Sequence, residues 1–310
     1  MGKSAGIHHI TGIAGNPRRH VAFYTDVLGL RLVKKTVNFD DPGTWHLYYG
    51  DETGSPGSAL TFFLWDGAAT GRAGAGQAVE TAFAIPESAI GYWTGRLVEK
   101  GIPHETPEKR FGQTVIGFKD PDGLRLDLVG SAAAAARPGW SKGEVPPEHA
   151  VRGFFGVTLW VDDPAPTARI LTEIFGFAAA GSQGTRHRFA AGGEALATVV
   201  DLRATPGFVP GALGRGTLHH VAFRAATDAD QRTMAGEAAH LGLRPTEQID
   251  RVYFRSVYFR EPGGVLLEIA TDGPGFTVDE PKEALGSSIR LPPWHEARRS
   301  TIEASLPPLA

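Results

Sequence analysis

The sequence predicts an α+β protein of four βαβββ units paired into two open, barrel-like domains, and two observations carry this prediction. Four predicted helices end at Gly29, Gly101, Gly176 and Gly242, which lie 72, 75 and 66 residues apart. Each of these helices follows a short apolar strand and precedes further strand-like stretches. Because self-similarity at a nearly constant period indicates a repeated structural unit, the chain is predicted to contain this unit four times.

The predicted helices begin at recognisable start signals. Asn16-Pro17 and Asp163-Pro164 each combine an N-cap residue with proline at the first helical position. The second helix is predicted to start near Pro86 and the fourth near Thr227. Between each start and its glycine, apolar residues recur at helical spacing, which is typical of a helix that packs one face on a sheet.

Short apolar runs before the helices predict the first strand of each unit, at Ile7–Ile13, Thr81–Ile85, Phe154–Val161 and Leu218–Arg224. In the first unit, three more strands are predicted at Arg31–Asn38, His46–Tyr49 and Leu60–Trp65. The ends of the second and fourth units also match each other. Asp120–Asp127 aligns with Glu261–Glu268 at an offset of 141 residues, and in both segments a turn leads into an alternating strand.

The repeat suggests a division of the chain into four segments. Residues 1–131 are predicted to hold one pair of units and residues 148–285 the second pair. Residues 132–147 form the predicted linker, because a polyalanine run there is followed by prolines and a glycine. Residues 286–310 form a proline-rich C-terminal tail.

Composition excludes several classes of protein. The chain has 310 residues, 42% of them hydrophobic and 21% charged, which is too apolar for a disordered protein. A formal net charge of −3 lacks the basic field of a non-specific nucleic-acid binder. The absence of cysteine excludes disulfides, thiolate nucleophiles and iron–sulfur clusters. Since the apolar runs are short and the first residues do not resemble a signal peptide, we expect a cytoplasmic protein without a membrane partner.

Two histidine pairs and one glutamate predict a metal site. His8-His9 lies on the first strand of unit one, and His219-His220 lies at the matching place in unit four. Strand alternation should point one histidine of each pair inward, unless a bulge brings in both. Glu268 stands in an otherwise apolar strand, where an unpaired carboxylate is costly. Two histidines and a carboxylate form the facial triad that leaves positions open on Fe(II) for substrate and dioxygen.

At this point the sequence resembles a known family over nearly its whole length. The resemblance is to the vicinal-oxygen-chelate (glyoxalase/bleomycin resistance/extradiol dioxygenase) superfamily, and most to its hydroquinone ring-cleaving dioxygenases. It rests on motifs such as Gly6–Ile13, Val27–Lys35, Tyr48–Asp51, Leu218–His220 and Pro262–Gly264. The resemblance implies the vicinal-oxygen-chelate fold, in which the units pair into open half-barrels.

The resemblance also implies a ligand set and its surroundings. It identifies the metal ligands as His9, His220 and Glu268, which requires unit one to pack beside unit four. The residues that it places around the substrate are Thr11, His219 and Arg251, with Tyr258 on the same strand system. Fe(II) is the expected metal, with Mn(II), Zn(II) or Ni(II) as possible substitutes. The expected partners are a small aromatic substrate and O2.

We therefore expect a non-haem Fe(II) dioxygenase that opens a hydroquinone-type ring, with catechol as the rival substrate class. One alternative is a glyoxalase-like isomerase or lyase with Zn(II) or Ni(II), although Leu60–Trp65 offers no clear fourth carboxylate ligand. Another alternative is a protein that sequesters a drug or quinone without turnover. Asp127 matches Glu268 in position but has no matching histidine, so it is interpreted as a remnant of the repeat. Exposed sheet edges favour a homo-oligomer, a dimer or larger.

Overall fold

The computed structural model describes residues 3–192 and 196–309 and contains the four predicted units. The strands of the first two units are β1 (Ile7–Ala14), β2 (Arg31–Val37), β3 (Trp45–Gly50), β4 (Ala59–Leu64), β5 (Gln77–Ile85), β6 (Glu108–Arg110), β7 (Gln113–Lys119) and β8 (Arg125–Gly130). Those of the last two are β9 (Phe154–Val161), β10 (Ala178–Gln183), β11 (Arg186–Ala190), β12 (Val199–Ala204), β13 (Thr217–Ala225), β14 (Ile249–Asp250), β15 (Arg255–Arg260) and β16 (Leu266–Thr271). The predicted α+β class and its repeat are confirmed.

One helical segment follows the first strand of each unit. The helices are α1 (Pro17–Ala22), which continues as a π-helical turn over Phe23–Val27, α2 (Ile90–Glu99), α3 (Pro164–Glu173) and α4 (Asp228–His240). Asn16, Asp163 and Thr227 cap α1, α3 and α4 by accepting hydrogen bonds from backbone N–H groups. The four predicted stop glycines all have φ between 67° and 82°, a conformation that other residues rarely adopt.

The strands form two eight-stranded sheets that do not follow chain order. One sheet has the order β14-β15-β16-β13-β1-β4-β3-β2, and the other has the order β10-β11-β12-β9-β5-β8-β7-β6. Unit four therefore pairs with unit one, and unit three pairs with unit two. We call the first sheet the outer half-barrel, because its units begin and end the repeat, and the second the inner half-barrel. The pairing of unit one with unit four, which the ligand set required, is confirmed.

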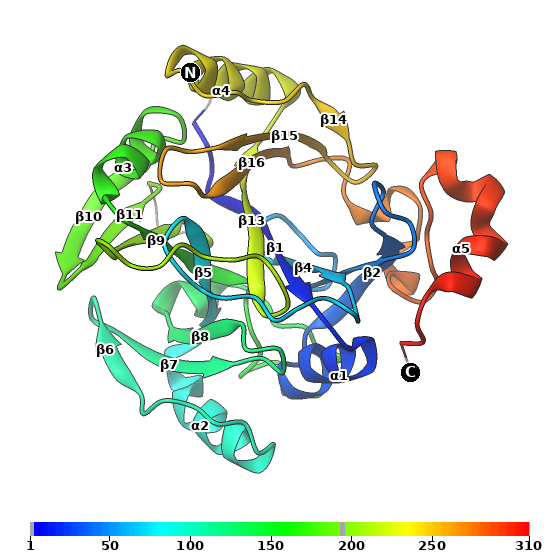
Figure 1. Cartoon of the computed structure of the whole chain (residues 1–310). Helices are drawn as coiled ribbons and strands as arrows, with labels where there is room; N and C mark the ends of the chain where they lie inside the picture. Colours follow the sequence, from blue (N-terminus) through cyan, green and yellow to red (C-terminus); the bar gives the residue numbers. More distant parts are fainter. Residues whose placement is uncertain (1–2, 193–195, 310) are drawn as a thin grey trace.

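The centre of each sheet is an antiparallel pair of first strands. In the outer half-barrel this pair is β1 and β13, which lie side by side in the middle of Figure 1. In the inner half-barrel it is β5 and β9. Each sheet therefore contains one unit from either side of the predicted linker at 132–147. That segment begins with a short 3-10 turn over Ala132–Ala136 and runs on to β9.

The C-terminal tail packs on the outer half-barrel. It ends with α5 (Arg299–Ser305), at the right of Figure 1. The Trp45 indole donates to the Pro307 carbonyl over 2.7 Å, and Arg31 donates to carbonyls of Lys282 and Glu283. The fully buried Lys34 pairs with Asp279. These contacts fix the tail and the segment that precedes it across β2 and β3.

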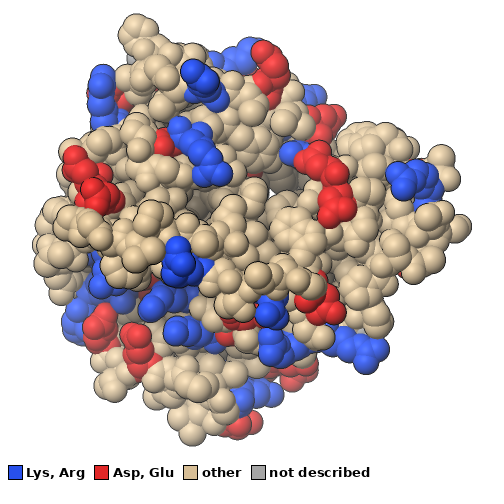
Figure 2. Space-filling model, in the orientation of Figure 1, with Lys and Arg blue, Asp and Glu red and all other residues tan. Residues whose placement is uncertain are grey.

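Charged side chains of both signs are interspersed on the face shown in Figure 2, in keeping with the small net charge. Lys and Arg gather most densely over the part of the molecule that holds β6 to β8. Within the described residues, every helix is too short or too polar to cross a lipid bilayer.

Candidate metal centre

The two central strands and β16 bring the predicted ligands together. In the sheet register Ala222 on β13 lies opposite His9 on β1 on one side and opposite Glu268 on β16 on the other. His220 lies two residues before Ala222 on β13. Its Nε2 lies 2.9 Å from Glu268 Oε2 and 3.3 Å from His9 Nε2. His9 Nε2 lies 3.3 Å from the same carboxylate oxygen, so all three ligand atoms converge on one point.

A β-bulge in each strand changes how the histidine pairs point. The register between β1 and β13 shifts once at His8 and once at His219. Strict alternation therefore fails at both pairs, and the two histidines of each pair contact each other. His8 Nδ1 lies 2.9 Å from His9 Nδ1, and His219 Nδ1 lies 2.8 Å from His220 Nδ1. Because each Nδ1 is engaged by its neighbour, the Nε2 atoms of His9 and His220 are directed at Glu268.

Burial keeps His8 and His219, the first histidine of each pair, neutral. It lowers the pKa of His8 to about 3, with a further contribution from His9. It also lowers the pKa of His219 to about 3, with a contribution from His220. His219 is only half-buried and borders a cleft of about 450 Å³ that Arg260 also lines. His219 thus contacts the predicted ligand His220 on one side and borders this cleft on the other.

Glu268 is fully buried, and its two carboxylate oxygens have different neighbours. Its Oε1 accepts a hydrogen bond of 2.5 Å from Ser256 Oγ. Burial by itself would raise the pKa of this carboxyl group, but His9 and His220 hold it well below its ordinary value. Oε2 has no well-oriented hydrogen-bond donor among the described residues. A buried anionic oxygen faced by two imidazole nitrogens is the donor set of a divalent cation.

Arg251 and Tyr258 lie beside these three residues. Tyr258 is opposite Glu268 in the β15–β16 register, and its ring centroid lies 5.6 Å from that of His220. The Arg251 guanidinium lies 5.6 Å from the Tyr258 ring centroid and pairs with the exposed Asp40 over 3.1 Å. Burial and the charge of Glu268 raise the pKa of Tyr258 above its ordinary value, so its hydroxyl stays protonated.

Thr11 belongs to a hydrogen-bond chain that sequence analysis did not find. Its Oγ1 lies 2.9 Å from Thr61 Oγ1, which lies 2.9 Å from His46 Nε2. His46 Nδ1 in turn lies 3.0 Å from the hydroxyl of Tyr48. Burial, and then the nearby His9 and His220, lower the pKa of His46 well below its ordinary value. His46, which the sequence predicted only as part of a strand, therefore lies next to the candidate centre.

The signal that could have identified His46 is its spacing from Tyr48. Residues two apart on a strand share a face, so His46 and Tyr48 on β3 point the same way. The face is shared with Thr61, because Tyr48 is opposite Thr61 in the β3–β4 register. Thr61 is likewise opposite Thr11 in the β1–β4 register.

Comparison with known proteins places the chain among related sequences. The family model described as the glyoxalase/bleomycin resistance protein/dioxygenase superfamily matches residues 6–128 and 153–269. The chain is 45% identical over 306 residues to the Bacillus subtilis (strain 168) protein named "Putative ring-cleaving dioxygenase MhqO", covering 99% of this chain and 97% of that protein. It is 33% identical over 303 residues to a chlorohydroquinone/hydroquinone 1,2-dioxygenase of Sphingobium indicum, covering 96% and 94%.

Two solved structures resemble this chain in fold, one closely and one more distantly. A crystal structure described as a "putative dioxygenase" of Bacillus subtilis has a TM-score of 0.94 at 44% identity, covering 100% of this chain and 99% of that one. Glyoxalase I of Zea mays has a TM-score of 0.64 at 16% identity, covering 86% and 92%. The second likeness concerns the fold alone.

Proposed function

The chain belongs to the glyoxalase/bleomycin resistance protein/dioxygenase superfamily, and we propose that within it the protein is an Fe(II)-dependent dioxygenase that opens a hydroquinone-type ring with O2. The observation that carries this proposal is the convergence of His9, His220 and Glu268 within 4.8 Å in a buried site. The names of the relatives support the reaction class, and that of the Sphingobium indicum protein supports a para-diol substrate.

Two imidazoles and one carboxylate fit Fe(II), because this ligand set leaves coordination positions open. A bound Fe(II) would supply those open positions to a substrate oxygen and to O2, and would lower the pKa of a bound phenol. His9 and His220 are proposed to bind through Nε2 and Glu268 through Oε2. Fe(II) is expected to bind three protein ligands, and His9, His220 and Glu268 are the one such cluster among the described residues. The glyoxalase-like alternative calls for a fourth ligand.

The surrounding residues are proposed to bind and orient the ring. Arg251 is suited to hold the oxygen remote from the metal, because Asp40, its one ion-pair partner among the described residues, is 75% exposed and so screens it weakly. Tyr258 and Thr11 are proposed to contact the substrate as hydrogen-bonding groups. His219 has its Nδ1 engaged by His220, which leaves Nε2 for proton exchange with substrate.

The test is oxygen uptake by anaerobically iron-loaded protein given methylhydroquinone, with catechol in parallel. We expect uptake with methylhydroquinone that is abolished in Glu268→Ala, together with loss of bound iron measured by elemental analysis. Asp127→Asn is the matched control, because it removes the equivalent carboxylate of the inner half-barrel and should leave uptake unchanged. A metal-loaded protein that consumes no oxygen with any phenol would contradict the proposal, and hemithioacetal isomerisation with Zn(II) or Ni(II) would then be measured.

Two further expectations accompany this proposal. A cytoplasmic location and a homo-oligomeric state both stay predictions. Sedimentation equilibrium of the purified chain measures the second directly, and fractionation of the producing cells measures the first.

A further inference from the structure

The inner half-barrel repeats the geometry of the outer one with different side chains. Ala82 on β5 lies between Gly156 on β9 and Asp127 on β8, just as Ala222 lies between His9 and Glu268. Glu80 precedes Ala82 by two residues, which is the place of His220. The three ligand positions are therefore occupied by glycine, glutamate and aspartate.

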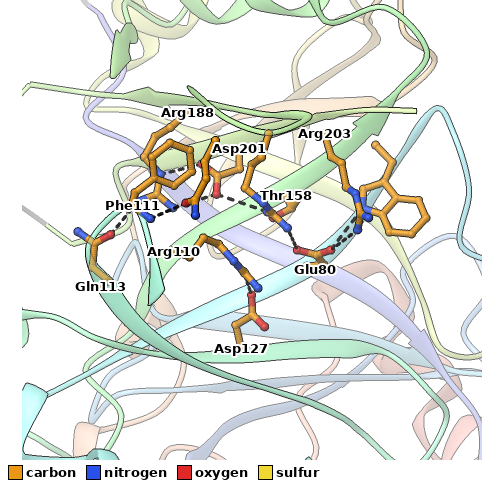
Figure 3. A network of polar contacts seen from close by, with 12 residues as sticks. Glu80, Arg110, Phe111, Gln113, Asp127, Thr158, Arg188, Asp201 and Arg203 are labelled. Carbon is orange, nitrogen blue, oxygen red and sulfur yellow. Dashed lines mark hydrogen bonds and ion pairs between the residues drawn. The ribbon is translucent and has the colours of Figure 1, made fainter. Parts of the chain in front are cut away.

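The two carboxylates at these positions are neutralised by arginines, not by imidazoles. Arg110 donates to Asp127 over 2.6 Å, and Arg186 donates to Glu80 over 2.9 Å. Figure 3 shows the guanidinium of Arg110 turned towards Asp127, with Glu80 close by. Since each anion already has a cation within hydrogen-bond distance, this arrangement does not suit a metal ion.

A third carboxylate is held in the same way. Arg188 donates through Nε and Nη2 to the two oxygens of Asp201, over 2.8 and 2.9 Å. Arg186 also reaches Asp201 over 3.4 Å and the Thr158 hydroxyl over 2.6 Å, so it joins Glu80 to Asp201. The Arg110–Asp127 pair lies beside this network without a hydrogen bond to it in Figure 3. Burying such a network costs desolvation free energy that apolar side chains would not incur, so stability alone does not account for it.

A cavity of about 830 Å³ opens beside this network. Its wall includes Glu80, Arg110, Asp127 and Arg186, whereas the neighbouring Phe118 and Leu126 are only 5% and 1% exposed and belong to the hydrophobic core. A space of this volume is in the range that holds a small organic molecule. It is far larger than an inorganic ion requires.

The same wall carries cations without a close anionic partner. Lys119 and Arg125 face each other in the β7–β8 register, and neither forms an ion pair with any described residue. Arg203 reaches Glu80 only at 3.8 Å, and its guanidinium lies 4.9 Å from the Trp160 ring centroid. Lys119 and Arg125 belong to β7 and β8, over which Figure 2 shows Lys and Arg gathered. The wall also carries Glu105, Glu108 and Asp120, so its six Lys and Arg side chains exceed its five Asp and Glu side chains by one, and Lys119 and Arg125 are among the cations without an ion pair to a described residue.

We propose that the inner half-barrel binds a small organic carboxylate in this cavity, with its carboxylate on Arg125 and Arg203. A guanidinium matches the planar geometry of a carboxylate, and the arginines of this half-barrel already hold three carboxylates of the protein itself. Lys119 at the rim adds electrostatic attraction. This binding site is separate from the candidate metal centre and does not depend on the proposed reaction.

The test is calorimetric titration of the full chain with succinate, with succinamide as the neutral analogue. We expect saturable binding of succinate and none of succinamide. The double variant Arg125→Gln/Arg203→Gln should bind succinate at least tenfold more weakly, while its melting temperature shows that it is folded. Arg169→Gln on the exposed face of α3 is the matched control and should bind as the parent does.

Three outcomes decide the proposal. Unchanged succinate affinity in His9→Ala supports the inner half-barrel as the site, whereas loss of binding there would move it to the metal centre and overturn the proposal. Equal affinity for inorganic phosphate and succinate would overturn the assignment of a carboxylate ligand. Absence of saturable heat, or equal affinity in the double variant, would overturn the site itself.

Discussion

The outer and inner half-barrels show how one backbone arrangement supports two kinds of polar interior. Both have an antiparallel pair of first strands at the centre, with the same register shifts beside the functional positions. In the outer half-barrel the single carboxylate of Glu268 faces two imidazoles. In the inner half-barrel Glu80 and Asp127 face guanidiniums. The choice between the proposed metal ligand set and an ion-pair network thus depends on a few side chains and not on the fold.

Arg251 and Arg110 make the comparison sharper. Arg251 follows the short strand β14 and Arg110 ends the short strand β6, and each precedes a residue with positive φ, Val252 at 68° and Phe111 at 48°. Arg110 donates directly to Asp127, the carboxylate at the position of Glu268. Arg251 instead lies over Tyr258 and pairs with the exposed Asp40. Because the histidines engage Glu268, the equivalent arginine of the outer half-barrel is left for another anion or oxygen.

The largest expected effect comes from His220→Glu, which places at the outer site the residue type that the inner one has at Glu80. The site then has two carboxylates and one imidazole, without an arginine to neutralise the added charge. We expect iron affinity to fall by at least about 100-fold, beyond the range seen when only a residue supporting a ligand is changed. Equilibrium dialysis against iron measures this, with Glu80→Gln as the control that retains the metal. Parental affinity in His220→Glu would show that the triad is not the metal site.

A second prediction concerns the inner ion pairs. Arg110→Met removes the partner of Asp127 and leaves a carboxylate that is only 8% exposed without its nearest cation. We expect a loss of about 3 kcal/mol in the free energy of unfolding, measured by urea denaturation. Adding Asp127→Leu should recover most of this loss, because the double variant has no unpaired charge. A double variant no more stable than Arg110→Met would contradict this account, because the unpaired carboxylate would then not be the cause of the loss.

The third prediction follows from the pKa of Asp127. Burial raises it to about 6, with Arg110 opposing the shift. The folded state therefore holds the proton more tightly than the unfolded state, whose pKa is near the ordinary value of about 3.9. The free energy of unfolding of the parent should fall, relative to Asp127→Asn, by up to about 3 kcal/mol as pH rises from about 4 to 6. Urea titrations across this range measure the difference, and a constant difference would contradict the shifted pKa.

The smallest effect is expected at a helix that covers the outer half-barrel. Thr227 caps α4 by accepting a hydrogen bond of 3.1 Å from the Asp230 N–H through its Oγ1. Thr227→Ala should lower the free energy of unfolding by about 1 kcal/mol. Thr227→Ser keeps the hydroxyl and is the matched control. An equal loss in both Thr227 variants would mean that the hydroxyl cap is dispensable for α4. The helix α2 of the inner half-barrel already lacks a side-chain cap.

Much of the fold was predictable because local signals define its elements. Proline after an N-cap residue and a glycine with positive φ mark the limits of α1 and α3. The pairing of unit one with unit four has no local signal, since strands far apart in the chain choose partners through tertiary packing. It followed only from the ligand set that the resemblance implied.

The candidate site was predictable where residue type is unusual for its surroundings. Paired histidines on apolar strands and Glu268 in an apolar strand are such cases. His46 was missed because a single histidine on a strand is ordinary, and its link to Thr11 passes through Thr61 on a different strand. The partners of Asp127 and Glu80 were missed for the same reason, since Arg110 and Arg186 become neighbours only when the inner sheet closes.

The nested order of the units has a consequence for synthesis of the chain. His9 leaves the ribosome 211 residues before His220, a delay of about 10 to 40 s at ordinary translation rates. All strands of the inner half-barrel lie between these two residues, so that half-barrel can be complete while β1 still lacks its central neighbour. The triad closes only when β16 is made. Iron captured by this site would therefore mark a chain whose last unit has already docked on its first.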